Sequence, residues 1–488
     1  MGDGMTVFHA YSPRIATWGS EPYAESSAVE VDAAVQAAAA AAPAWAAAGA
    51  ETRSALLDGL AAALEATREE LVPMADAESA LGLPRLNGEL DRTAFQLRRF
   101  ASLCRQGVPF QAVDDPAVIG PPSVGHPPMR RLFLPLGPVA MYAASNFPFA
   151  FSVLGGDTAS ALAAGCPVVI KAHQGHPGLS RRTWALAQSV LAEQGLPAGL
   201  IGFVQGASPE VGLALVRHPS IAAAAFTGST RGGIALWKEA QARPRPIPFF
   251  GELGAINPVL VWPGAQTDAL ADTLAASITL GCGQFCTNPG LIVLLQGPQT
   301  PAFVARLTSA LAQQQPHPML TPGMRQAFVD GTQRQLAHGA KVLLQEPDTA
   351  QAPRPFLAEV DAATFVAKPE LREEVFGPSS LLVHAPDAAA AEATLRAIGG
   401  SLTVTLHGAQ DNAEGRALLQ AALAVAGRVL FAGVPTGVAV TAAQQHGGPW
   451  PATTAPQTTS VGDAALQRFQ RPVCLQDAPD WVLGALPA

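Results

Sequence analysis

The sequence predicts an α/β fold built from two doubly wound parallel-sheet domains and a small β arm. Short apolar runs alternate with helical runs from about residue 132 to residue 435. The 488 residues are more than one ordinary core holds, which favours two domains. Two proline-rich stretches flank the alternating region and indicate the arm. A hydrophobic content of 49% with 14% charged residues is typical of a globular chain.

The chain should begin with helices. Apolar side chains recur at helical spacing in Glu51–Ala77 and Glu89–Leu103, so residues 28 to 106 are expected to be helical. From Leu132 onward, short strands alternate with helices, which predicts a Rossmann-like parallel sheet covered on both faces. The strands expected here are Val139–Tyr142, Pro167–Lys171, Leu200–Val204, Ala223–Thr227 and Pro246–Phe250. The helices expected between them are Gly156–Ala164, Gly178–Gln194, Pro209–Val216 and Thr230–Ala240.

A second α/β unit should follow, because residues 257 to 435 repeat the alternation. Its expected strands are Pro258–Val261, Leu291–Leu295, Lys341–Leu344, Ser379–His384, Leu402–Leu406 and Arg428–Phe431. Its expected helices are Asp268–Leu280, Pro301–Gln313, Pro322–Leu336, Ala388–Ile398 and Ala413–Val425. The domains predicted are therefore residues 1–113 with 135–251 (cofactor-binding), 252–440 (catalytic) and 114–134 with 453–488 (oligomerisation arm). An exposed ribbon edge is usually covered by a partner chain, so a homodimer or homotetramer is expected.

Composition excludes several classes of protein. The net charge of −8, the pI of about 5.7 and the lack of a basic stripe argue against nucleic-acid binding. Five scattered cysteines form no disulfide framework and indicate a reducing compartment. The first residues lack a signal-peptide pattern, and Pro43 interrupts the alanine-rich stretch Ala33–Ala50. We therefore expect a cytoplasmic protein without a membrane span.

A cysteine and a carboxylate are the main candidates for chemistry. Cys286 lies in a loop of glycine and small polar residues before an apolar strand, which favours a reactive thiol over a buried structural cysteine. Cys282 is expected to be a packing residue, and no second Cys/His pair lies near enough to predict a metal site. Glu252 is flanked by glycines after an apolar run. It is either a strand-end surface charge or a base whose pKa burial raises.

Other candidates have simpler structural alternatives. Asn146 follows a predicted strand and is either a turn residue or an oxyanion donor. Lys171 ends a predicted strand, where it would face either solvent or a ligand crevice. The turn Phe226–Gly233 could hold a pyrophosphate with its backbone N–H groups, although it lacks the G-x-G-x-x-G pattern. Glu374 and Phe376 lie in either a surface turn or a ribose site.

Together these motifs resemble the aldehyde dehydrogenase superfamily, in the family's order and over nearly the whole chain. The motifs are Ser145-Asn146-Phe147-Pro148, Val169-Ile170-Lys171, Phe226-Thr227-Gly228-Ser229, Glu252-Leu253-Gly254, Gly283-Gln284-Phe285-Cys286 and Glu374-Val375-Phe376-Gly377-Pro378. The stretch His446–Thr453 is similar to the branch that contains α-ketoglutaric semialdehyde (2,5-dioxovalerate) dehydrogenases and NADP-preferring fatty-aldehyde dehydrogenases.

The resemblance implies roles for individual residues. Cys286 would be the nucleophile, Asn146 with the Cys286 backbone N–H would hold the oxyanion, and Glu252 would activate the hydrolytic water. The residues implied to bind NADP or NAD are Lys171, Gln174, Phe226, Gly228, Ser229, Gly233, Glu374 and Phe376. Gln174 is a neutral amide where NAD-specific members commonly carry a glutamate, so NADP is admissible. The nearby arginine considered for the 2′-phosphate of NADP is Arg217.

The expected reaction is NAD(P)+-dependent oxidation of an aldehyde to an acid through a cysteine thioester. A dicarboxylate semialdehyde, 2,5-dioxopentanoate, would need a cation, for which Arg98, Arg99, Arg468 and Arg471 are candidates. A medium- or long-chain aldehyde would need an apolar tunnel, which Phe147, Phe149, Phe285 and Trp450 could line. A non-catalytic protein on the same scaffold and a coenzyme A-acylating enzyme are the remaining alternatives. Retention of Glu252 argues for hydrolysis.

Overall fold

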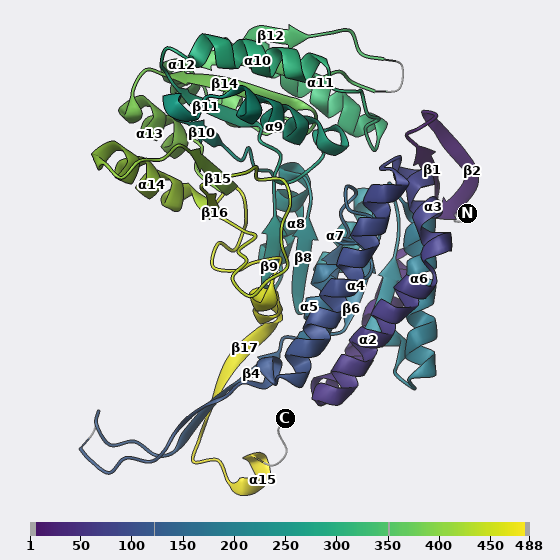
Figure 1. Cartoon of the computed structure of the whole chain (residues 1–488). Helices are drawn as coiled ribbons and strands as arrows, with labels where there is room; N and C mark the ends of the chain where they lie inside the picture. Colours follow the sequence, from purple (N-terminus) through teal and green to yellow (C-terminus); the bar gives the residue numbers. More distant parts are fainter. Residues whose placement is uncertain (1–5, 122, 350–351, 484–488) are drawn as a thin grey trace.

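The computed structural model describes residues 6–121, 123–349 and 352–483, and it contains two parallel sheets and an antiparallel arm (Figure 1). The predicted α/β class with parallel sheets is confirmed. Parts of the predicted domains lie outside the described residues. These parts are residues 1–5 of the predicted cofactor-binding domain, residues 122 and 484–488 of the predicted arm, and residues 350 and 351 of the predicted catalytic domain. No described helix is long and apolar enough to cross a membrane.

The first sheet has five parallel strands in the order β7-β6-β5-β8-β9. The strands are β5 (Val139–Tyr142), β6 (Val168–Lys171), β7 (Ile201–Val204), β8 (Ala223–Thr227) and β9 (Phe249–Glu252). Side chains that alternate along β5 enter different cores: Val139 and Met141 pack on one face, Ala140 and Tyr142 on the other. The carboxyl ends of the strands place Lys171, Thr227 and Glu252 along one edge.

Helices cover both faces of this sheet. The bounds are α1 (Ala28–Ala46), α2 (Ala50–Ala66), α3 (Arg68–Ser79), α4 (Leu83–Arg105), α5 (Gly156–Ala164), α6 (Pro177–Glu193), α7 (Pro209–Arg217) and α8 (Thr230–Ala242). The side chains of α2, α3, α4, α5 and α6 join the core that contains Val139, and those of α7 and α8 join the opposite core. The helix α1 contributes to both cores. The helix α1 begins at a capping box in which Ser27 and Glu30 each accept from the other's backbone N–H.

The second sheet has seven strands in the order β12-β13-β14-β11-β10-β15-β16, parallel except for the antiparallel edge strand β12. The strands are β10 (Val259–Val261), β11 (Leu291–Leu295), β12 (Lys341–Gln345), β13 (Phe356–Asp361), β14 (Ser379–Ala385), β15 (Ser401–His407) and β16 (Ala426–Leu430). The helices are α9 (Asp268–Thr279), α10 (Thr300–Ala312), α11 (Pro322–Ala337), α12 (Ala362–Ala367), α13 (Ala388–Ala397) and α14 (Ala413–Val425). Short 3-10 helices cover Val108–Phe110, Ala198–Leu200, Pro263–Ala265, Leu280–Gly283, Pro369–Arg372 and Asp463–Phe469.

Two small antiparallel sheets complete the molecule. The arm pairs β3 (Val113–Asp115), β4 (Met129–Pro135) and β17 (Gln470–Gln476) in the order β17-β4-β3, and Figure 1 shows it projecting from the body. The hairpin β1 (Val7–Ser12) with β2 (Thr17–Ala24) lies beside α3. A short helix, α15 (Asp480–Leu483), follows the arm.

The structure corrects several sequence expectations. The last strand of the first sheet is shifted to Phe249–Glu252, because Pro246 and Pro248 lack the N–H that a ladder needs, and it therefore reaches Glu252. The hairpin β1–β2, the strand β13 and the helix α12 were not predicted. Residues 453–469 do not belong to the arm. Thr453 pairs with Glu252 in an isolated β-bridge instead, so this segment lies against the first sheet.

Arg53 holds the first helices to α5 and generates a stability prediction. Its side chain is 1% exposed and donates to the carbonyls of Ala163 (3.0 Å) and Ala46 (2.9 Å). Because Arg53→Met leaves both buried carbonyls without a donor, we expect a loss of about 2–4 kcal/mol and a lower thermal unfolding midpoint. Arg98→Met removes an exposed pair with Glu65 and should cost less than about 1 kcal/mol. Equal unfolding midpoints for the two variants would contradict the prediction.

Candidate active site

Cys286 opens into a cavity of about 370 Å³ between the two sheet units. The first unit contributes the Ala143–Asn146 segment, the β8–α8 turn and the end of β9, and the second contributes Cys286, α11 and the Glu374–Phe376 loop. The nucleophile candidate therefore lies where the carboxyl ends of the first sheet face the second unit, which is the usual ligand crevice of such sheets. Glu252 lines the same cavity as Cys286.

Three side chains from separate segments meet here. The Cys286 sulfur lies 3.5 Å from Nε2 of His446, and that nitrogen lies 3.1 Å from Oε1 of Glu252. The reactive atoms of all three are within 4.8 Å of one another. Ser460 donates from its hydroxyl to the other oxygen of Glu252 at 2.7 Å. Glu252 and His446 are 3% and 2% exposed, so these contacts are shielded from water.

The environment favours the charged form of Glu252 and the neutral form of Cys286. Burial acts to raise the pKa of Glu252, but the charge and hydrogen bond of His446, with hydrogen bonds from Ser460 and Cys286, lower the pKa below its ordinary value. The expectation of a raised pKa for Glu252 was therefore wrong, because these partners stabilise the carboxylate more than burial destabilises it. Burial and the Glu252 charge raise the pKa of Cys286 well above its ordinary value. The site therefore favours a carboxylate beside a neutral thiol.

The loop that carries Cys286 is fixed by backbone contacts. The amide of Asn257 donates to the carbonyls of Cys286 (2.7 Å) and Asn288 (3.0 Å). Asn257 is fully buried with a φ of 46°, a left-handed conformation that asparagine tolerates better than most residues. A Cβ on Gly283 would lie 2.1 Å from the carbonyl oxygen of Gly377, so only glycine allows this close approach. These contacts set the position of the thiol.

Asn146 lies beside the same loop. Its side-chain amide donates to the backbone carbonyl of Gln284 at 3.0 Å, and its backbone carbonyl accepts from Arg85 at 2.6 Å. Glu89, on α4, accepts from the backbone N–H groups of Phe149 and Ala150 and holds the segment that follows. An asparagine amide has two N–H groups. One of them is bonded to Gln284, and the structure gives the other no acceptor among the described residues.

The residues expected at the cofactor fall into two groups. Phe226, Gly228, Ser229, Glu374 and Phe376 line the cavity with Cys286. Ser229 caps α8, accepting from the N–H of Gly232 at 3.3 Å, so the positive end of this helix faces the cavity. Gly233 lies beneath Phe226 and Leu253, where a Cβ would come within 2.2 Å of the leucine.

Lys171 and Gln174 do not line this cavity. Lys171 ends β6 and donates to the carbonyl of Gly206. Burial lowers its pKa to about 8, against the opposing effect of the Glu25 charge. Gln174 is exposed.

Glu374 combines a confined position with a raised pKa. A Cβ on Gly254 would lie 2.6 Å from a Glu374 oxygen, which explains the need for glycine there. Burial, with a contribution from the Glu252 charge, raises the pKa of Glu374 to about 8 even though a backbone N–H opposes it. Glu374 is therefore mostly protonated at neutral pH and can donate a hydrogen bond into the cavity.

Of the four aromatic residues expected at a substrate pocket, two lie together beside Arg85 and the other two lie elsewhere. The rings of Phe147 and Phe285 meet edge to face at 5.3 Å, and both contact the Arg85 guanidinium. Phe149 is 2% exposed and lies in the core of the first unit, and Trp450 is 47% exposed and packs on Trp237. Neither of these positions agrees with lining a substrate pocket, because a ring buried in the core or open to solvent cannot face the thiol.

His446 is the functional residue that sequence reasoning missed. The stretch His446–Thr453 supported the family resemblance but gave no role to the histidine. A histidine followed by two glycines does not indicate which distant carboxylate it will contact. Glu252, Cys286 and His446 also form the group of ligand-type side chains, among the described residues, that could hold a metal ion. The absence of a metal centre stays a prediction.

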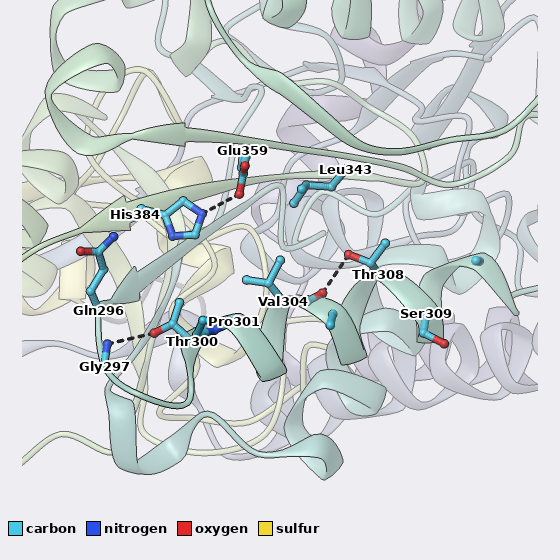
Figure 2. Close-up of a pocket in the computed structure, with 12 residues that line it drawn as sticks. Gln296, Gly297, Thr300, Pro301, Val304, Thr308, Ser309, Leu343, Glu359 and His384 are labelled. Atoms are coloured by element: carbon cyan, nitrogen blue, oxygen red, sulfur yellow. Dashed lines mark hydrogen bonds and ion pairs between the residues drawn. The ribbon is translucent and has the colours of Figure 1, made fainter.

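A larger cavity of about 1080 Å³ lies in the second unit (Figure 2). Residues of α10 form one wall, and Leu343, Glu359 and His384 lie across from them, with His384 2.9 Å from Glu359. Its lining has no cysteine, and no residue of the first sheet contributes to it. The smaller cavity beside Cys286 is therefore the candidate active site.

Comparisons with known proteins identify the family of the chain. Residues 8–397 match the model of the aldehyde dehydrogenase family. The chain is 44% identical to α-ketoglutaric semialdehyde dehydrogenase 2 of Azospirillum brasilense, over 88% of this chain and 83% of that one. It is 40% identical to α-ketoglutaric semialdehyde dehydrogenase of Acinetobacter baylyi, over 89% and 84%.

Solved structures share the fold at lower identity. The crystal structure of PnpE in complex with nicotinamide adenine dinucleotide matches with a TM-score of 0.81 at 23% identity, over 97% of this chain and 95% of that one. Aldehyde dehydrogenase 21 of Physcomitrella patens, in complex with the reaction product succinate, matches with a TM-score of 0.80 at 21% identity and the same coverage.

The raised pKa of Glu374 generates a pH-dependent stability. The unfolded carboxyl loses its proton near its ordinary value of 4.5, whereas the folded one keeps it until about 8. The folded state binds more protons in that window, so the contribution of Glu374 to stability falls as the pH rises. We expect the unfolding midpoint of the wild type, relative to Glu374→Gln, to fall between about pH 5 and pH 8. A constant difference, measured by thermal unfolding, would show that Glu374 titrates normally.

Proposed function

This chain belongs to the aldehyde dehydrogenase family, and we propose that its aldehyde substrate is 2,5-dioxopentanoate, which it oxidises to 2-oxoglutarate. The chain is an NAD(P)+-dependent oxidoreductase that acts on aldehydes. The substrate proposal is supported by two relatives at 40–44% identity that are named for the semialdehyde of α-ketoglutarate. The observation that carries the chemistry is the contact of Cys286 with Glu252 and His446, of which Cys286 and Glu252 line one cavity.

The first half of the reaction uses Cys286. The Cys286 thiol donates a hydrogen bond to the Glu252 carboxylate and passes its proton to that carboxylate, which releases it to solvent before the second half, and the sulfur adds to the aldehyde carbon. The oxygen of the resulting thiohemiacetal becomes an oxyanion that the free N–H of Asn146 and the Cys286 backbone N–H stabilise. A bound nicotinamide supplies the hydride acceptor, and the product on the cysteine is a thioester.

The second half uses Glu252. A water attacks the thioester carbonyl, its proton goes to the carboxylate of Glu252, and the C–S bond breaks to release the acid and the thiolate. The lowered pKa of Glu252 keeps it ionised and ready to accept this proton. His446 donates from Nε2 to Oε1 of Glu252 at 3.1 Å and thereby orients the carboxylate beside the sulfur.

The residues around the cavity fit a dinucleotide. Backbone N–H groups at the start of α8, with Gly228 and Ser229, suit a pyrophosphate, and Gly233 allows that helix to pack closely. Lys171 and Glu374 are proposed to hold the two riboses, and Phe226 and Phe376 to flank the cavity. Gln174 carries no charge to repel a 2′-phosphate, whereas Arg217 is already paired with Glu239 at 2.7 Å. Both NADP and NAD therefore belong in the test.

Each structural unit is proposed to have a separate role. We propose that residues 1–113 and 135–251 bind the cofactor and residues 252–440 carry the nucleophile. The arm strands β3 (Val113–Asp115), β4 (Met129–Pro135) and β17 (Gln470–Gln476) are proposed to mediate a homodimer or homotetramer. Val113, Val118, Ile119 and Phe133 are exposed apolar residues in or beside the arm, which supports a partner there.

Variants of the two reacting groups should fail in different ways. Cys286→Ala removes the nucleophile and should lower kcat by at least about 10³-fold, since no covalent intermediate can form. Glu252→Gln should give a burst of reduced cofactor and then slow turnover, because acylation proceeds but hydrolysis lacks its base. Stopped-flow absorbance of the reduced nicotinamide distinguishes the two. Full steady-state activity of Cys286→Ala would refute the mechanism.

The substrate is tested with a panel of aldehydes and each cofactor. We expect kcat/KM to be higher for 2,5-dioxopentanoate than for octanal, because the relatives are named for the former. A preference for octanal would favour an apolar tunnel beside Phe147 and Phe285 and would reject the proposed substrate.

The proposed role of the arm in oligomerisation is tested by measuring the molar mass of the protein in solution. Light scattering should give a multiple of the 50.2 kDa chain mass for the wild type. Phe133→Asp places a charge on the exposed face of β4 and should shift the protein toward the single-chain mass. Phe95→Asp, on an exposed position of α4, is the matched control. A wild type of single-chain mass would reject the assembly.

A further inference from the structure

The arginines expected to bind a substrate carboxylate are already occupied. Arg98 pairs with Glu65 on the surface, Arg99 with Asp463, and Arg468 is buried against Asp157. Arg471 lies exposed on β17, in the arm. None of these groups is free beside Cys286, so a carboxylate on the substrate needs another partner.

Two other arginines, one from each sheet unit, donate hydrogen bonds to the same loop. Arg92, on α4, donates to the carbonyl of Val438. Arg428, on β16, donates to the carbonyls of Gly437 (3.0 Å) and Pro435 (2.7 Å). Their guanidinium groups therefore converge on residues 435–438, one from the first unit and one from the second.

Both guanidinium groups keep donors without an acceptor. Nε and Nη2 of Arg92 and Nε of Arg428 are buried and have no hydrogen-bond partner among the described residues. Neither arginine forms an ion pair with a described carboxylate. A buried N–H of a charged group without a partner is costly, and a carboxylate oxygen is the acceptor that a guanidinium binds best.

The position of α4 brings Arg92 close to the reacting groups. Arg85, Glu89 and Arg92 share one helix face, and the first two hold the segment from Asn146 to Ala150. Arg428 directly follows Gly427, on which a Cβ would lie 2.2 Å from the carbonyl oxygen of Gly447, the residue after His446. Burial lowers the pKa of both Arg92 and Arg428.

Neighbouring charged groups do not replace a ligand. Arg85 is enclosed, because the rings of Phe147 and Phe285 flank its guanidinium and a Cβ on Gly281 would lie 2.4 Å from its Nη1. Glu89 uses one oxygen for two backbone N–H groups, and burial raises its pKa despite Arg85 and Arg92, so it neutralises Arg92 only in part.

We propose that Arg92 and Arg428 form the binding site for the carboxylate of the substrate and select acid-bearing aldehydes over neutral ones. The proposal rests on the proposed function and specifies its substrate class. The aldehyde end of the substrate reaches Cys286 while the carboxylate accepts hydrogen bonds from Nε and Nη2 of Arg92 and from Nε of Arg428. These two arginines are thus specificity residues that the reaction chemistry itself does not need.

The test compares 2,5-dioxopentanoate with pentanal, a neutral aldehyde of the same chain length, in the full-length enzyme with its cofactor. Losing a charge-assisted hydrogen bond should lower the ratio of the two kcat/KM values roughly 10- to 100-fold in Arg92→Gln, mainly through KM for the acid. Arg428→Gln should lower the ratio less, since it offers one free donor. Arg92→Lys should restore part of the ratio, and Arg98→Gln, on the outer surface of the same helix, should leave it unchanged.

The outcomes separate this inference from the proposed function. An unchanged ratio in Arg92→Gln, or an equal loss with both aldehydes, overturns the carboxylate site, because the residue is then either irrelevant or only structural. If the wild type itself shows no preference for 2,5-dioxopentanoate over pentanal, the proposed substrate is wrong. As a second measurement, 2-oxoglutarate should inhibit pentanal oxidation by the wild type competitively and should inhibit Arg92→Gln at least several-fold more weakly. Equal inhibition also overturns the site.

Discussion

The contact of His446 with both Cys286 and Glu252 is the interaction around which the two sheet units are arranged. Cys286 comes from the loop before β11 and Glu252 from the end of β9, and neither segment alone brings them together. The segment that returns from the second unit supplies His446 and Ser460 and bonds to β9 through the bridge of Thr453 to Glu252. A displacement of either unit would therefore separate the thiol from the carboxylate.

This arrangement is stabilised by backbone geometry more than by charge. Gly283 approaches Gly377, Gly254 approaches Glu374, and Gly233 lies beneath Leu253, each at a distance that a Cβ would not allow. Asn257 holds the carbonyl of the reactive cysteine from a left-handed conformation. Such contacts cost conformational entropy and some strain, and they give a fixed position to a thiol whose pKa is high.

Around this centre, charged groups are distributed by function. Most surface arginines face a carboxylate across an exposed pair that contributes little to stability. Glu374 instead lies half-buried at the cavity with a raised pKa, and Arg92 and Arg428 keep donors without a partner among the described residues. Buried polar groups without partners are rare in folded proteins, and among the described residues those of Arg92 and Arg428 meet at one loop, residues 435–438.

The sequence alone determined the α/β class, most helices and strands to within two residues, and the candidates Cys286, Glu252 and Asn146. These follow from local information, since apolar periodicity sets each element and glycine-rich loops mark strand ends. The register of β9, the role of Phe149 in the core, the contact of His446 and the convergence of Arg92 with Arg428 came only from the tertiary structure. They depend on how residues hundreds of positions apart pack together, and on which neighbour satisfies each buried charge. No local pattern records that choice, because the free energy of a buried polar group is set by its surroundings rather than by its neighbours in the chain.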